Sequence, residues 1–168
     1  VKDGVNVVGA FDDAVEYTFN DRAGDVHDAL RAFVRSMPLA VRFARAGLPD
    51  VLCAHSLPAP ELMDRFDPAI IERAEPLNDD DYVPRRGSAH LMVWGRGHTP
   101  EQLRMLAERW GVGLFVLGHE KAESGLIRLE PNALVLNSDH ARGVYLDVAA
   151  ETARTVEAFA GCARSLSE

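Results

Sequence analysis

Cysteine, long apolar runs and basic charge are all scarce in this sequence of 168 residues. Its two cysteines, Cys53 and Cys162, are too far apart to suggest a disulfide framework or a cysteine-rich zinc site. The formal net charge of −8 argues against a nucleic-acid partner, which needs clustered Lys and Arg. No apolar run approaches the roughly 20 residues that span a bilayer, which argues against a membrane partner. Together these absences predict a protein of a reducing, cytoplasmic setting.

The composition that remains is that of a globular domain, with 47% hydrophobic and 26% charged residues. We expect residues 1–168 to form a single domain, or the C-terminal part of one, with an irregular lead-in over 1–24 and a terminal helix or tail over 151–168. Within the lead-in, the alternating residues Ala14 to Phe19 predict one short strand. The chain begins at Val1 without an initiator Met, so we expect the natural N-terminus to be absent.

Hydrophobic periodicity predicts a mixed α/β fold. Apolar residues at helical spacing predict a helix from Asp25 to Met37, and Thr99-Pro100 is a helix start whose periodic face ends at Trp110. Apolar runs at Leu91–Trp94 and Leu114–Leu117 predict strands on either side of this helix, the order typical of an α/β unit. The remaining segments are predicted as a hairpin over Leu39–Ala54, short helices over Glu61–Phe66 and Pro68–Ala74, a long loop over Glu75–Ser88, and a meander of strands over Gly125–Leu129, Ala133–Asn137 and Val144–Val148.

Two histidines follow predicted strands directly. His55 comes after Val51–Ala54, and His119 comes after Leu114–Leu117 and Gly118. Ligands of open α/β sheets bind beyond the carboxyl ends of strands, and imidazole is the commonest metal ligand. The alternative is that these rings only bond to backbone carbonyls. Of the other histidines, His140 is a third strand-end residue, His27 is interpreted as a solvated helix residue, His90 as structural, and His98 either as facing the same cleft as Arg96 or as a polar loop residue.

Four segments resemble the phosphoprotein phosphatase branch of the calcineurin-like metallophosphoesterases. Residues 52–58, Leu-Cys-Ala-His-Ser-Leu-Pro, look like that family's His-Gly-Gly-Leu-Ser-Pro segment, and Leu117-Gly118-His119-Glu120 looks like its Arg-Gly-His-Glu segment. Between them, residues 91–94 resemble its hydrophobic strand that ends in Trp. Residues 135–140 fall where the family has Phe-Ser-Ala-Pro-Asn-Tyr. The four segments occur in the family's order and cover the chain from about Leu39 to Val148.

The resemblance implies two packed mixed sheets, a β-sandwich, flanked by helices, and hydrolysis of a phosphoester by metal-activated water at two divalent metal ions (Mn, Fe or Zn). The substrate would be a phosphorylated protein or a small phosphoester. By the same resemblance His55 and His119 are ligands of one metal, and Arg96 binds the substrate phosphate, with Arg86 as its rival. His140 stands where the family has Tyr, which makes it a weaker phosphate contact.

The family's first three motifs are absent from the sequence. Asp-x-His, Gly-Asp-x-x-Asp-Arg-Gly and Gly-Asn-His-Glu would supply the remaining ligands and the catalytic acid; Asp25-Val26-His27 spells the first only by chance, inside a predicted helix. The chain thus resembles the C-terminal half of a phosphatase, holds no catalytic residue, and is expected to be inactive without the N-terminal half of the same fold upstream. The alternatives are a non-catalytic binding or regulatory module on a degenerate phosphatase scaffold, which the missing glycines after His55 would suit, and an unrelated α/β domain with structural histidines.

Overall fold

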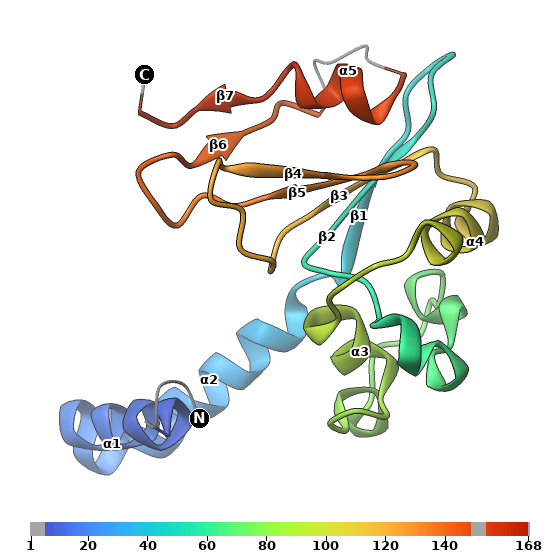
Figure 1. Cartoon of the computed structure of the whole chain (residues 1–168). Coiled ribbons are helices and arrows are strands. Elements are labelled where there is room, and N and C mark those ends of the chain that lie inside the picture. Colours follow the sequence, from blue (N-terminus) through green and yellow to red (C-terminus); the bar gives the residue numbers. More distant parts are fainter. Residues whose placement is uncertain (1–5, 149–153, 168) are drawn as a thin grey trace. The chain divides into compact units, whose positions relative to one another are not determined.

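The computed structural model describes residues 6–148 and 154–167, and the chain separates into two compact units, Val1–Pro38 and Leu39–Glu168 (Figure 1). The expectation of a single domain over 1–168, or of the C-terminal part of one, stays a prediction. Each unit is therefore described by itself.

The first unit is a pair of helices. Its helices are α1 (Val7–Phe19) and α2 (Ala23–Ser36), joined by a 3-10 turn, η1 (Asn20–Arg22). The predicted helix from Asp25 to Met37 is confirmed as α2. The predictions of an irregular lead-in and of a strand over Ala14–Phe19 are wrong, because residues 7–19 are helical. Six alternating residues are too few to exclude a helix, and Val15 of this stretch is buried while its neighbours Glu16 and Tyr17 are exposed.

The second unit is built on a mixed five-stranded sheet with the strand order β1-β2-β3-β5-β4. The three central strands are parallel to one another, and each edge strand pairs antiparallel with its neighbour. This arrangement confirms the mixed α/β class and the hairpin β1–β2. The strands are β1 (Ala40–Phe43), β2 (Val51–Ala54), β3 (Leu114–Leu117), β4 (Leu126–Leu129) and β5 (Ala133–Leu136).

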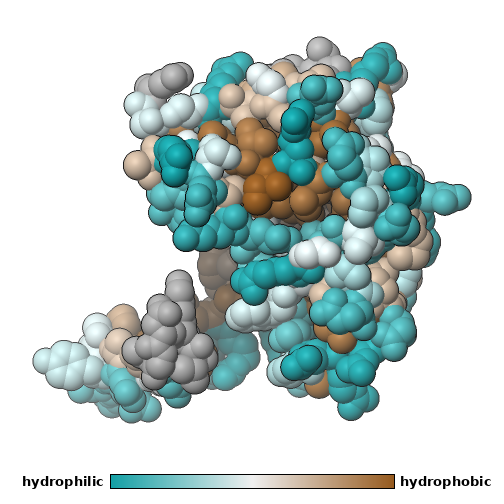
Figure 2. Space-filling model, viewed as in Figure 1, coloured by the Kyte–Doolittle hydropathy of each residue, from teal (hydrophilic) through white to brown (hydrophobic). Residues whose placement is uncertain are grey.

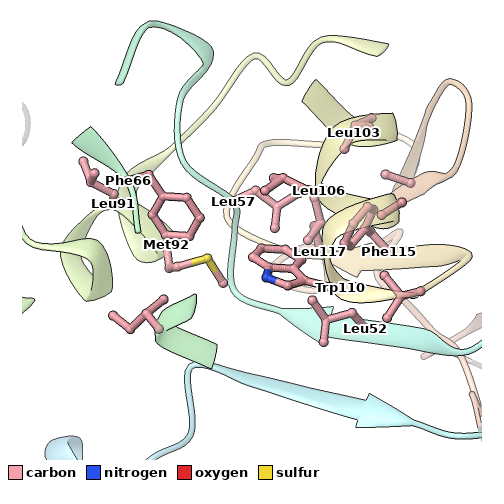
Figure 3. Close-up of a cluster of buried hydrophobic side chains, with 14 of the residues drawn as sticks. Leu52, Leu57, Phe66, Leu91, Met92, Leu103, Leu106, Trp110, Phe115 and Leu117 are labelled. Atoms are coloured by element: carbon pink, nitrogen blue, oxygen red, sulfur yellow. The ribbon is translucent and has the colours of Figure 1, made fainter. Parts of the chain in front are cut away.

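Side chains of the central strands alternate between two hydrophobic clusters, one on each face of the sheet. On one face Leu52, Phe115 and Leu117 pack with Leu106 and Trp110 of α4 (Pro100–Trp110), as Figure 3 shows. The opposite face carries Val51, Leu114, Val116 and Leu134 against α5 (Val156–Ala160). Because both faces are covered, the central strands appear in the sequence as unbroken apolar runs instead of alternating ones.

The segment between β2 and β3 consists of helical turns and helices. Three 3-10 helices, η2 (Pro60–Arg65), η3 (Pro68–Ile71) and η4 (Asp79–Tyr82), precede α3 (Ser88–Trp94) and α4. The strand expected over Leu91–Trp94 is wrong, because these residues belong to α3. Four consecutive apolar residues do not distinguish a buried strand from one buried turn of helix, and Leu91 and Met92 are buried in either case.

A second, two-stranded sheet pairs β6 (Val144–Tyr145) with β7 (Arg164–Ser165). The predicted strand over Val144–Val148 is thus shorter, and the predicted terminal helix over 151–168 is reduced to α5, while residues 149–153 lie outside the described part. Figure 2 shows hydrophobic side chains at the level of the larger sheet, framed by hydrophilic ones. Among the described residues, no helix has the length and apolar character needed to cross a membrane.

Candidate functional site

The parallel pairing of β2 with β3 brings His55 and His119 together. Ala54 is the register partner of Leu117, so the residues that follow both strands leave the same edge of the sheet. The Nε2 atom of His55 lies 3.0 Å from the Nδ1 atom of His119, and the ring centroids are 4.7 Å apart. The structure thus brings these two strand-end histidines together; their role as ligands of one metal stays a prediction.

His119 has an unusual backbone conformation, with a φ of 66°. Its two neighbours are bridged by a bond from the Glu120 amide to the Gly118 carbonyl (2.8 Å), which closes a three-residue turn centred on His119. Turns of this hand are rare and strained for residues other than glycine, and such strain concentrates at functional sites. The amide of Gly118 donates to the carbonyl of His55 (3.1 Å), so the turn is also tied to the end of β2.

Burial keeps the imidazole of His119 neutral near neutral pH. It lowers the pKa of His119 below its usual value of 6.5, and the positive charge of Arg96 lowers it further, against the opposing effect of Glu120. A metal ligand must present an unprotonated nitrogen, and a lowered pKa meets that need. The Nε2 atom of His119 is buried without a hydrogen-bond partner, so the protein fixes neither nitrogen of this ring apart from the contact with His55.

The spacing of the two rings fits joint coordination of one ion. Two nitrogens that each lie about 2.0–2.1 Å from a metal are about 2.9 Å apart at a right angle and about 3.4 Å apart at the tetrahedral angle. The 3.0 Å separation of His55 Nε2 and His119 Nδ1 falls within that range and is also the length of a hydrogen bond between the two rings in the absence of metal. Two imidazoles do not complete a site, however, and residues 6–148 and 154–167 contain no group of three or more His, Cys, Asp or Glu that could hold a metal. Nearby Cys53 adds no thiolate, because burial raises its pKa to about 11.

Arg96 lies on an exposed loop between two glycines at the same edge of the sheet. A Cβ at Gly95 would overlap the carbonyl oxygen of Leu57, so only glycine allows this loop to pack directly on the chain that follows His55. Gly97 has a φ of 69° and donates its amide to Glu120 (3.2 Å). These contacts join the loop of Arg96 to the loops of both histidines.

The rival arginine lies in the turn that follows η4. Arg86 is exposed, and among the described residues it makes no hydrogen bond or ion pair with His55 or His119. Its amide instead donates to the carbonyl of Val83 (3.2 Å) in the turn after η4.

His140 is placed differently from the other two strand-end histidines. Its Nε2 lies 2.8 Å from the carbonyl of Ala122, and its Nδ1 accepts from the amide of Arg142 (3.1 Å). Both nitrogens are therefore used to join the loop after β5 to the loop after β3. With Lys121, Glu123 and Arg142 the residue lines an open cavity of about 440 Å³.

A further aromatic group at the site was missed by sequence analysis because α3 was expected to be a strand. Trp94 is 59% exposed, packs edge-to-face with His119 (centroids 5.8 Å apart) and stacks on His90 (5.9 Å). The Nδ1 atom of His90 accepts from the amide of Arg85 (3.2 Å), so its Nε2 carries the proton when the ring is neutral. The spacing of four residues between His90 and Trp94 is the signal that could have found them, since such residues share one helix face.

A cavity of about 400 Å³ opens beside this aromatic pair, next to His119. Apolar, aromatic and charged groups all contribute to its wall, a mixture that suits an organic group carrying polar atoms. It is lined by Ala59, Glu61, Leu62, Arg85, His90, Leu91, Trp94 and Gly95.

In comparisons with known proteins, no family model, no curated protein and no solved structure matches the chain.

Proposed function

We propose that this chain supplies the late part of a metal-dependent phosphoesterase site, in which His55 and His119 hold one divalent metal ion and Arg96 binds the substrate phosphate. The observation that carries the proposal is the 3.0 Å separation of the two ring nitrogens at one edge of a parallel strand pair. The strained turn at His119 and its lowered pKa support it. The metallophosphoesterase fold is part of this proposal.

The residues of this chain bind and orient in the proposed reaction. A divalent metal ion would supply the means to activate water and to neutralise charge on the phosphoryl oxygens. Arg96 would offer planar, paired N–H donors to those oxygens, and its place between Gly95 and Gly97 leaves it exposed for that contact. The chain offers no general acid of its own in this scheme.

The organic part of the phosphoester would lie in the cavity of about 400 Å³ beside His119. Trp94 forms the wall that is common to the cavity and the imidazole pair, so a phosphate near His119 would place its leaving group against the indole. Glu61 and Arg85 at the same cavity could pair with charges on that group.

The proposed site needs more ligands than two imidazoles. We propose that they come from the N-terminal half of the same fold, on a longer polypeptide of which this chain is a part. It follows that the chain as printed has no phosphatase activity, while the longer polypeptide has it.

The experiment measures Mn²⁺-dependent hydrolysis of p-nitrophenyl phosphate by the chain and by the full-length polypeptide. We expect turnover by the full-length polypeptide alone. There, Arg96→Ala and Trp94→Leu should raise KM, the first by about tenfold or more because a charge-assisted contact to phosphate is worth about 1.5–3 kcal/mol. The matched control is Arg104→Ala, which removes an exposed arginine of α4 whose partner is Glu101 on the same helix.

The outcomes separate the two candidate functions. Absence of Mn²⁺-dependent turnover by the full-length polypeptide would reject the phosphoesterase proposal, and turnover by the chain alone would reject the claim that it holds only part of a site. The alternative function, a non-catalytic binding module, is favoured by the lack of a third ligand among the described residues. It predicts ligand binding without stoichiometric metal or turnover.

A further inference from the structure

Each of the three candidate site residues is followed closely in the chain by a polar residue that takes part in one common cluster. His55 is followed by Ser56, Arg96 by Gly97 and His98, and His119 by Glu120. The side chains of Ser56 and His98 are almost completely buried, with 0% and 1% exposed, and that of Glu120 is 22% exposed. Three loops that are distant in sequence thus meet through side chains other than the proposed ligands.

His98 lies at the centre of this cluster. Its Nε2 atom is 3.3 Å from the Ser56 hydroxyl oxygen and 3.7 Å from a carboxylate oxygen of Glu120. The hydroxyl of Ser56 donates to the carbonyl of Gly95 (2.6 Å), and its oxygen lies within hydrogen-bond distance of His98 Nε2. The Nδ1 atom of His98 is buried and has no hydrogen-bond partner among the described residues.

Glu120 closes the cluster from the third loop. The carboxylate oxygen that faces His98 also accepts the amide of Gly97 (3.2 Å). Ser56 therefore ties the His55 loop to the Arg96 loop, and Glu120 ties the His119 loop to the same Arg96 loop. The backbone hydrogen bond from Gly118 to His55 joins the His119 loop to the His55 loop, so all three loops are linked in pairs.

We propose that Ser56, His98 and Glu120 are positioning residues that hold the loops of His55, Arg96 and His119 in one fixed arrangement. Stability alone does not require polar groups here, since burying them costs free energy that apolar side chains of similar size would not. Hydrogen bonds such as those from Ser56 to Gly95 and from Gly97 to Glu120 are directional, however, and they fix the relative placement of loops that have no strand partners of their own. The inference rests on the proposed function only for the roles of His55, Arg96 and His119.

The test compares the imidazole ¹⁵N signals of His55 and His119 in the protein and in Ser56→Ala and Glu120→Ala. We expect both variants to fold and to shift the signals of both rings, although neither substitution touches a ring. Both Glu120 variants lose a charge that acts on His119, so the effect of position is judged by comparing them: Glu120→Gln keeps an oxygen for the Gly97 amide and should shift the signals less than Glu120→Ala does. The matched control, Thr155→Ala, removes the capping bond to Ala158 at α5 and should leave the signals unchanged while lowering stability.

A second measurement is the affinity of the full-length polypeptide for Zn²⁺, which Ser56→Ala and Glu120→Ala should weaken about tenfold, as loss of outer contacts around metal ligands does. Unchanged ¹⁵N signals in both variants, equal shifts in Thr155→Ala, or a Glu120→Gln variant that behaves like Glu120→Ala would each overturn the positioning role. Failure of the unaltered protein to bind Zn²⁺ would count against the proposed metal site, and the ¹⁵N comparison would still decide the positioning role.

Discussion

The loop that carries His140 and the loops that carry His55 and His119 occupy equivalent places, each after a parallel strand of one sheet, yet their imidazoles are engaged in different ways. Backbone groups of Ala122 and Arg142 occupy both nitrogens of His140. The rings of His55 and His119 contact each other, and one buried nitrogen of His119 has no partner. A position at a strand end thus brings a side chain to the site edge, but only the contacts around it decide whether the side chain can bind a ligand.

The cavities beside these loops also differ in their lining residues. The one next to His119 is walled by Trp94, His90 and Leu91 along with charged groups. The one at His140 is open and is lined by Lys121, Glu123 and Arg142. The first has aromatic rings in its wall beside polar groups, a frequent character of small-molecule sites.

The largest expected difference between the two regions is in metal affinity. His119→Ala removes one of two facing nitrogens and should weaken Zn²⁺ binding by at least about 100-fold, the upper range for losing an outer contact around a ligand. His140→Ala should change it less than about twofold, because both nitrogens of that ring already bond to the backbone. Titration calorimetry with Zn²⁺ measures both. Equal losses in the two variants would remove the distinction between the loops.

The free energy of unfolding should depend more on His140 than on His55, and the effect should be smaller than the effect on metal affinity. His140→Ala removes two hydrogen bonds to backbone groups and should lower the free energy of unfolding by about 1–2 kcal/mol. His55 is exposed, and within the described part of the chain its ring has a hydrogen bond only to His119, so His55→Ala should cost less than about 0.5 kcal/mol. Urea unfolding of the protein and both variants provides the comparison. A greater cost at His55 than at His140 would contradict the structural role given to His140.

That the loops of His55 and His119 are neighbours could be predicted from sequence because it follows from strand pairing. The unbroken apolar runs Val51–Ala54 and Leu114–Leu117 indicate central parallel strands, and parallel strands end at one edge. Register then places His55 beside Gly118, one residue short of His119. The general geometry of a sheet therefore predicts that the two loops are neighbours, while the contact between the rings also depends on the turn centred on His119.

What could not be predicted depends on contacts between distant segments. The burial of Ser56 depends on Gly95, 39 residues further along, and the engagement of His140 depends on Ala122 in another loop. The cavity at Trp94 depends on whether residues 91–94 form a helix or a strand, and four apolar residues leave that choice to tertiary packing. Helix α1 was missed for the same reason, because the short alternating stretch from Ala14 to Phe19 fits a strand as well as a helix.

The smallest expected effect concerns the influence of Arg96 on His119. The positive charge of Arg96 is the second cause, after burial, that holds the pKa of His119 below 6.5. Arg96→Ala should therefore raise the pKa of His119 toward 6.5 without reaching it, since burial remains. Arg104→Ala, which removes an exposed charge elsewhere on the sheet unit, should leave the pKa unchanged. An imidazole titration followed by NMR in the absence of metal measures each value.

The sign of the effect on stability follows from the same shift. The unfolded chain, with its ordinary pKa, takes up a proton at His119 first as the pH falls through about 6.5, so this residue makes the fold less stable below that pH and has no effect well above it. In Arg96→Ala the loss should be smaller, because the two pKa values lie closer together. An unchanged pKa of His119 in Arg96→Ala would show that the guanidinium is too far from the imidazole pair to share a phosphate with it. The loop of His119 would then lack the anion-binding partner that distinguishes it from the loop of His140.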